Sequence, residues 1–231
     1  FRGTDVPKPP FVGARVLADV AVDEIARYVD WRFFFSAWDL KGRFPAILEH
    51  PKYSAAARDL YEHGRELLER IATEKLLTVR AAYGFWPASG EKNDIVLYED
   101  DTRAHERARF FMLRQQKKHE NGEYRCLADF VAPRARGIDD YVGGFVITAG
   151  LGADAVADAF KAAHDDYNAI MIKVLADRLA EAAAEWLHER VRREWGYEHD
   201  ARSLDDLLAE TYRGIRPALG YPACPAHTEK R

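Results

Sequence analysis

Apolar positions along this chain recur with helical periods in some stretches and alternate as in strands in others. The clearest helical stretch begins at Ser54, and its apolar or small residues recur at spacings of three and four: Ala57, Leu60, Tyr61, Gly64, Leu67, Leu68 and Ile71. Such spacing places one face of a helix against a core. We predict that Ser54 caps this helix and that the apolar face is core packing.

Shorter apolar runs predict strands at 14–20, 78–86, 94–98, 109–113, 127–131 and 142–148. The last of these runs is almost continuously apolar, which is typical of a strand near the centre of its sheet. Proline, glycine and polar residues between the runs predict turns. Strands and helices are therefore expected in one mixed domain.

A long helical pattern begins at Asp154 and continues to about Arg193. At about 1.5 Å per residue, one straight helix of this length would span roughly 60 Å, more than the width of a domain of this size. We therefore expect a bend near 164–168. A last helix is predicted from a cap at Ser203 to about Arg213.

The stretch 216–225 near the C-terminus differs in composition from the rest of the chain. Its sequence is Arg-Pro-Ala-Leu-Gly-Tyr-Pro-Ala-Cys-Pro, and the prolines forbid a regular helix or an inner strand. We interpret it as a stiff, extended loop whose backbone amides and carbonyls need water or a ligand as partner. On composition alone, a surface tail is an equally good interpretation.

Composition and charge exclude several classes of function. The formal net charge is −4, with 34 basic and 38 acidic residues, so the chain lacks the basic surplus typical of nucleic-acid binding. The apolar runs are too short to span a bilayer, so no membrane partner is expected. The chain has only two cysteines, Cys126 and Cys224, which favours a reducing, cytoplasmic location. None of the eight histidines has a partner at metal-ligand spacing, and no metal site is predicted.

Several smaller patterns are candidates for chemical function. Residues 150–155 fit the G-x-G-x-x-A fingerprint of dinucleotide-binding folds, but no second strand pattern follows, so we favour a glycine turn before a helix capped by Asp154. Cys224 is interpreted as a packed, inert thiol. Asp30 lies in an aromatic cluster and is either solvated, the favoured interpretation, or held for a ligand. Glu181 and Glu185 begin a charged helix face that we expect to be mostly solvated. No catalytic residue is predicted.

The C-terminal stretch carries a more specific pattern. Residues 213–230, Arg-Gly-Ile-Arg-Pro-Ala-Leu-Gly-Tyr-Pro-Ala-Cys-Pro-Ala-His-Thr-Glu-Lys, closely resemble the signature of the activation domain of cobalamin-dependent methionine synthase. The resemblance extends to five other stretches: Asp30-Trp31 with the aromatics after it, Arg114–Gln116, Cys126–Pro133, Ala163–Asn168 and Ala176–Ala182.

The resemblance implies an α+β fold. We expect a linker at 1–13 and a single C-shaped activation domain at 14–231, with a bent, mainly antiparallel sheet flanked by helices. Such a domain binds S-adenosyl-L-methionine (AdoMet) and presents its methyl group to reduced cobalamin, which restores methylcobalamin in 5-methyltetrahydrofolate–homocysteine methyltransferase. The implied partners are the neighbouring domain that binds cobalamin and a flavodoxin-type or reductase electron donor. The isolated chain is not expected to turn over alone.

The same resemblance implies which residues contact AdoMet: Asp30, Glu181, Glu210, Arg216, Ala218 and Tyr221. Asp177 is expected at the docking surface for the cobalamin domain. The chain departs from the family at Leu219, where a proline is usual, and it stops at Arg231, so a shortened C-terminus is expected. The alternative function is a non-catalytic docking or sensing domain for the cobalamin module and the reductant.

Overall fold

The computed structural model describes residues 6–117, 122–200 and 202–230. Its sheet has five strands: β1 (Gly13–Leu17), β2 (Thr78–Glu91), β3 (Asp94–Tyr98), β4 (Glu106–Phe111) and β5 (Asp140–Leu151). β2 is the central strand, because it pairs with β5 along most of its length and with β1 and β3 at successive positions on its other edge. β4 pairs with β3, and each of these strand pairs is antiparallel.

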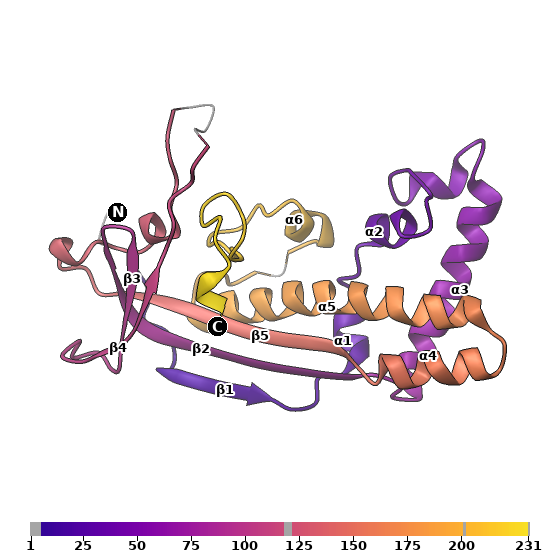
Figure 1. Ribbon diagram of the computed structural model, residues 1–231, viewed down its shortest axis with the longest axis horizontal. Helices are drawn as coiled ribbons and strands as arrows, with labels where there is room; N and C mark the ends of the chain where they lie inside the picture. Colours follow the sequence, from indigo (N-terminus) through magenta and orange to yellow (C-terminus); the bar gives the residue numbers. More distant parts are fainter. Residues whose placement is uncertain (1–5, 118–121, 201, 231) are drawn as a thin grey trace.

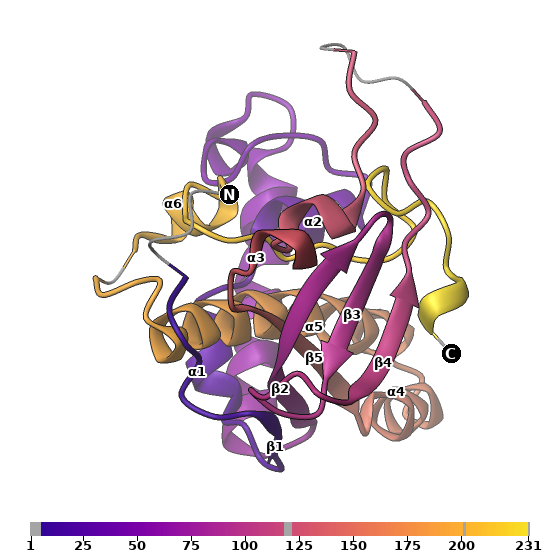
Figure 2. The same ribbon diagram turned by 90° about the vertical axis from the view of Figure 1, so that its left-hand side faces the viewer.

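The sheet is strongly bent, and the domain is C-shaped in outline (Figure 1). β2 and β5 run along the lower side of the view, whereas β3 and β4 stand nearly upright at one end. The turned view shows β3 and β4 face-on (Figure 2). The register shifts between Thr78 and Arg80 and between Leu97 and Tyr98, and such irregularities increase the local twist. The α+β fold with a bent antiparallel sheet is therefore confirmed.

Six α-helices and four short 3-10 helices accompany the sheet in the described residues. The α-helices are α1 (Val22–Ala26), α2 (Trp31–Ser36), α3 (Ser54–Thr73), α4 (Ala153–Ala162), α5 (Asp166–Trp195) and α6 (Leu204–Leu208). The 3-10 helices are η1 (Ala46–Glu49), η2 (Leu127–Phe130), η3 (Arg134–Arg136) and η4 (Thr228–Lys230). α5 lies along β2 and β5, and α6 and the C-terminal segment lie on the opposite side of α5 (Figure 1).

Two hydrophobic clusters hold the domain together. The larger one joins α1, α2, α3 and α5 to the first half of β2, and includes Phe34, Ile71 and Leu179. The smaller one joins the end of β2 to β3 and η2, and its buried members are Ala88, Ile95, Leu97, Met112, Cys126, Leu127, Ala128, Val131 and Cys224. Because Cys224 belongs to the smaller cluster, the C-terminal segment is part of the core.

Two predicted elements are corrected by the structure. The pattern at 154–193 forms two helices, α4 and α5, which pack side by side, and Asp165 caps α5 by accepting from the Asn168 amide at 3.0 Å. The expected bend is therefore a complete reversal, and the long helix is Asp166–Trp195. The predicted strand 127–131 is η2, because the Asp129 carboxylate accepts from the Cys126 amide at 2.8 Å and starts a helical turn.

Three helix ends also differ from the prediction. Tyr53 is the N-cap of α3 without a side-chain bond, so Ser54 is already helical. Gly152, with φ 103°, is the N-cap of α4 where Asp154 was expected, because the chain turns there from β5 into the helix in a left-handed conformation. Ser203 caps α6 as predicted, but that helix ends at Leu208.

The helix after the glycine turn does not lead into a parallel strand. In the described part of the chain no strand follows α4, which removes the basis for a dinucleotide-binding fold. Within those same ranges, no helix is both long enough and apolar enough to cross a bilayer.

Candidate functional site

The site is built on α5, where three acidic residues follow one another at intervals of four. Asp177 and Glu181 are exposed, whereas the side chain of Glu185 is only 13 % exposed. Residues four apart lie on neighbouring turns of one helix face, so this acidic line leads from solvent toward the interior. His188 and Arg192 continue it and are buried.

The prediction of a mostly solvated face is therefore wrong from Glu185 onward. The segment that follows α5 returns over this face, and it places the ring of Tyr212 3.8 Å from the Arg192 guanidinium. Helical periodicity cannot reveal such a cover, because it arises from residues outside the helix.

Ionic contacts fasten the returning segment to α5. The Nε of Arg192 donates to Glu198 at 2.9 Å, and Arg192 and Glu198 are both buried. Glu198 also pairs with Arg202, whose Nη1 donates to the Thr211 carbonyl at 2.9 Å. These contacts fix Glu198, Arg202 and Thr211 relative to one another and to the end of α5.

His188 is the neutral member of this buried network. Its Nδ1 lies 2.7 Å from Nη1 of Arg192, and its ring packs edge-on against Tyr212. Burial, with added repulsion from Arg192 and Arg216, lowers the pKa of His188 to about 3. The ring is therefore uncharged at neutral pH, and its Nδ1 accepts the arginine hydrogen bond.

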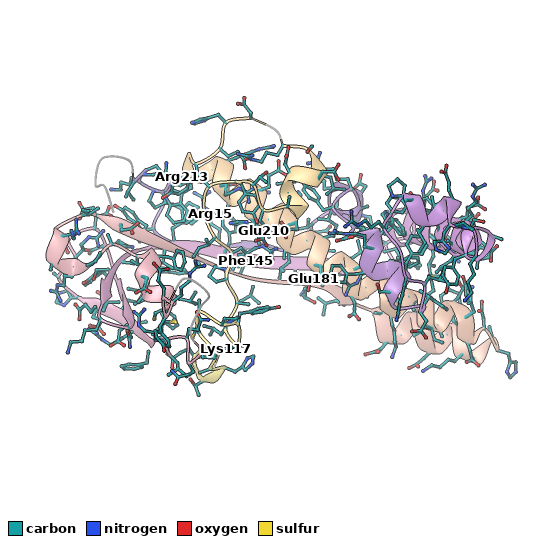
Figure 3. All side chains as sticks on the ribbon, turned by 90° about the horizontal axis from the view of Figure 1, so that it is seen from above. Arg15, Lys117, Phe145, Glu181, Glu210 and Arg213 are labelled. Atoms are coloured by element: carbon teal, nitrogen blue, oxygen red, sulfur yellow. The ribbon has the colours of Figure 1, made fainter. Side chains whose placement is uncertain are left out.

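Glu181 and Glu210 approach Glu185 from two different elements. Glu210 is exposed, follows α6 and has φ 54°. Figure 3 shows the two side chains over neighbouring parts of α5. Burial raises the pKa of Glu185, Arg216 opposes this, and the charges of Glu210 and Glu181 raise the pKa further. Neither Glu181 nor Glu210 makes a hydrogen bond or ion pair with any residue that the structure describes.

Arg216 lies at the centre of this acidic group. Its guanidinium pairs with Oε1 of Glu185, and its side chain is 23 % exposed. Among the described residues, Oε2 of Glu185 and Nε of Arg216 are buried without a partner. The structure thus brings three of the predicted residues, Glu181, Glu210 and Arg216, around Glu185.

Asp30 is held separately at the start of α2. It is the N-cap of that helix, accepting from the Arg32 amide at 2.9 Å, and its carboxylate also binds the Arg32 guanidinium through both oxygens. Its side chain is only 14 % exposed, so the favoured interpretation of a solvated carboxylate is wrong. The hydrogen bond and the charge of Asp30 raise the pKa of Arg32, burial opposes them, and the charge of Asp205 in α6 makes the smallest contribution.

The loop after Arg216 has the extended, unpaired backbone that its prolines predict. The amides and carbonyls of residues 215–219 make no hydrogen bond with the rest of the described chain. Ala218 is exposed, and Tyr221 is 66 % exposed. This backbone and the tyrosine ring are available to a ligand.

The loop is nevertheless firmly anchored beyond Tyr221. Cys224 is buried, as predicted for an inert thiol, and the Ala223 carbonyl accepts from the Leu127 amide at 3.0 Å. Leu219 packs against the smaller core. Gly220 has φ +99°, and a Cβ there would lie 2.0 Å from the His227 ring, so the turn requires glycine. The surface-tail interpretation is therefore wrong.

Comparison with known proteins assigns this arrangement to a family. A family model described as vitamin B12 dependent methionine synthase, activation domain, matches residues 21–231. The chain belongs to this family. The chain is similar to the protein in the crystal structure of the MetH reactivation domain bound to AdoHcy, with 45 % sequence identity and a TM-score of 0.92. The match covers 98 % of this chain and 70 % of that one. The family and fold that the sequence resemblance implied are confirmed.

Sequence reasoning missed one central residue of this activation domain, Glu185. A cue was present, because Glu185 lies four residues after Glu181 and is flanked by apolar residues on both sides, Ala184 and Trp186. That cue indicates a helix position at the border of the buried face. It does not reveal the partner, Arg216, which is 31 residues away.

Proposed function

We propose that this activation domain binds AdoMet between α5 and the loop 215–221, and that it presents the ligand's methyl group to reduced cobalamin held by a neighbouring domain. The observation that carries the proposal is the backbone of residues 215–219, which lies next to the Arg216 side chain and the carboxylates of Glu181 and Glu210; neither this backbone nor these two carboxylates have a partner among the described residues. The similarity to a reactivation domain bound to AdoHcy supports the same ligand class.

The side chains present fit the polar groups of AdoMet. The planar guanidinium of Arg216 suits the ligand's carboxylate, and Glu181, Glu210 and Asp30 suit its ammonium group and ribose hydroxyls. Backbone groups around Ala218 suit the hydrogen-bonding edge of adenine, and the exposed ring of Tyr221 suits a sulfonium cation. Each group of the ligand therefore has a partner of matching chemistry.

For the methyl transfer, this chain has to align the ligand, and it does not have to supply an acid or a base. Bound AdoMet supplies an activated methyl group, which reduced cobalamin accepts directly. The residues of this domain bind and orient the ligand and keep competing nucleophiles away. No proton moves in the transfer, so the domain needs no acid–base pair. The isolated domain would not turn over, because the reaction also needs the cobalamin of a neighbouring domain and a flavodoxin-type or reductase electron donor. We place the domain and these partners in the cytoplasm.

Asp177 supports docking to the cobalamin domain. It is exposed on α5, two turns before Glu185, and is therefore accessible to a partner domain near the proposed site. We expect Asp177→Asn to weaken binding to the cobalamin domain in calorimetry, with Asp19→Asn as an exposed control. Equal affinities of the two variants would contradict this role.

Titration of the chain with AdoMet in a calorimeter tests the binding proposal. We expect the double variant Arg216→Ala and Tyr221→Ala to lose binding while retaining its circular dichroism spectrum. Arg80→Ala, which removes an exposed arginine from β2, should bind like the wild type.

Unchanged affinity in the double variant would show that the loop is not the ligand site. Failure of the wild-type chain to bind AdoMet would favour the alternative function, a docking or sensing domain that engages the cobalamin module and the reductant without holding the ligand.

A further inference from the structure

The pair formed by Glu185 and Arg216 joins a rigid helix to the loop of the proposed site. We infer that Glu185 is a positioning residue: it fixes the direction of the Arg216 guanidinium, so that the remaining N–H groups face the carboxylate of the bound ligand. This inference rests on the proposed function and adds a residue to it.

The backbone at Arg216 is restricted, but its side chain needs a partner to hold one direction. Pro217 fixes its own φ and confines the preceding residue to extended conformations. The long arginine side chain still has several freely rotating bonds and carries considerable rotamer entropy. Glu185 lies within the 30-residue helix α5 and is therefore a stationary acceptor. One contact to it leaves the rest of the planar fork free for a ligand.

Stability alone does not explain this pair. Removing two charges from water costs about as much as their attraction returns, unless every polar atom is satisfied. Here burial raises the pKa of Glu185, and Arg216 and Arg192 only partly offset the combined effect of burial, Glu210 and Glu181, so the ionised form of Glu185 remains disfavoured. Oε2 of Glu185 and Nε of Arg216 also lack partners among the described residues. The pair therefore leaves buried polar atoms unsatisfied, and holding the Arg216 side chain in one direction accounts for it where stability does not.

The other nearby cation does not compete for Glu185. Arg192 is held by Glu198 at 2.9 Å and by His188 at 2.7 Å, and its guanidinium stacks on Tyr212. Glu185 and Arg216 therefore form an ion pair of their own at the edge of the buried network, on the side where Glu181 and Glu210 are exposed, although the charges of Arg192 and Arg216 also act on Glu185 and His188 across it.

Two ligands that differ in the relevant group test the inference. S-adenosyl-L-homocysteine carries the amino-acid carboxylate and ammonium, and 5′-methylthioadenosine lacks both, so a double-mutant cycle is also needed to assign the effect to Arg216 and the carboxylate. In calorimetry, Glu185→Ala should weaken binding of S-adenosyl-L-homocysteine by about tenfold or more and leave methylthioadenosine within about twofold of the wild type. Glu185→Gln, which keeps the volume and an acceptor oxygen, should give a smaller loss of the same selectivity and remains informative if the alanine variant does not fold.

A double-mutant cycle tests whether Glu185 acts through Arg216. Arg216→Ala alone and Arg216→Ala with Glu185→Ala should bind S-adenosyl-L-homocysteine equally within about twofold, because the positioned group is already absent. A further loss in the double variant, or equal losses for both ligands in Glu185→Ala, would overturn the positioning role. Wild-type affinity in the Glu185 variants would also overturn it and leave the proposed function intact. Failure of the wild-type chain to bind either ligand would overturn both.

Discussion

Two clusters of arginine and carboxylate side chains lie in this domain, and they are built differently. Where β2, β3 and β4 meet, all three guanidinium nitrogens of Arg109 donate to carboxylates, with Glu106, Glu91 and Asp94 as acceptors. At the C-terminal end of α5, Arg192 and Glu198, which follows the helix, are buried, and Nη2 of Arg192 has no partner among the described residues. The first cluster is complete and reaches solvent, whereas the second is incomplete and enclosed.

This difference shows that exposed and buried ion pairs have different roles in the domain. Exposed ion pairs contribute little to stability, because water competes for the same groups and salt screens them. Buried pairs are hard to break, because removal of one partner leaves the other as an uncompensated charge. The α5 cluster therefore fixes the course of the chain that carries Glu210 and Arg216, and the Arg109 cluster has no comparable task.

Removal of the Glu198 carboxylate should cause the largest loss of stability among the variants of these two clusters. Glu198→Ala leaves Arg192 and Arg202 without their shared partner, and we expect the free energy of unfolding to fall by about 3–5 kcal/mol. Urea denaturation at pH 7 measures this change. Glu198→Gln, which keeps the shape, should lose less, and a loss below about 1 kcal/mol in Glu198→Ala would contradict the enclosed nature of the cluster.

The pH dependence of stability offers a second, smaller test. The unfolded chain protonates His188 below its ordinary pKa of 6.5, whereas the folded protein does so only near 3. Unfolding thus becomes easier as the pH falls through this window, by up to about 1.4 kcal/mol per pH unit.

In His188→Asn, the amide oxygen can accept from Arg192 as Nδ1 does, and no proton is taken up. Comparison of urea midpoints at pH 7, 6 and 5 should therefore show a shallower fall for the variant. Parallel curves for variant and wild type would show that His188 is protonated in the folded state as well.

The smallest effect is expected in the complete cluster. Glu106→Ala leaves Arg109 bound to Glu91 and Asp94 at a partly solvated site, so its unfolding free energy should stay close to that of the wild type. Any small difference should disappear when urea denaturation is repeated in 1 M salt, where charges are screened over about 3 Å. A large, salt-resistant loss would remove the distinction between the two clusters.

The elements of this fold that depend on local pattern could be predicted from the sequence. The helical period of its apolar residues predicted α3, and an almost continuous apolar run predicted β5. The expectation that this strand is central is wrong, because in the described residues β5 pairs with β2 alone. The run at 127–131 was misassigned as a strand, because five residues with apolar ends fit a strand as well as a short turn. The deciding bond, from the Cys126 amide to Asp129, is visible only in the structure.

The site could be predicted in its members but not in its arrangement. Resemblance to a family identified Arg216, Glu181 and Glu210, and the structure places them around one residue that no pattern had selected. Glu185 and His188 lie on a charged helix face, and their burial depends on a segment that follows α5 in the chain. Local periodicity describes the helix itself and contains no information about what later covers it.

The loop 215–221 is supported by two different hydrophobic clusters. On one side Tyr212 packs on the larger cluster, and on the other Leu219 and Cys224 pack on the smaller one. The course of the loop is therefore defined only while both clusters are intact. A molecule bound on this loop would therefore stabilise the packing of both clusters at once. It would oppose their separation from each other more than the unfolding of either cluster alone.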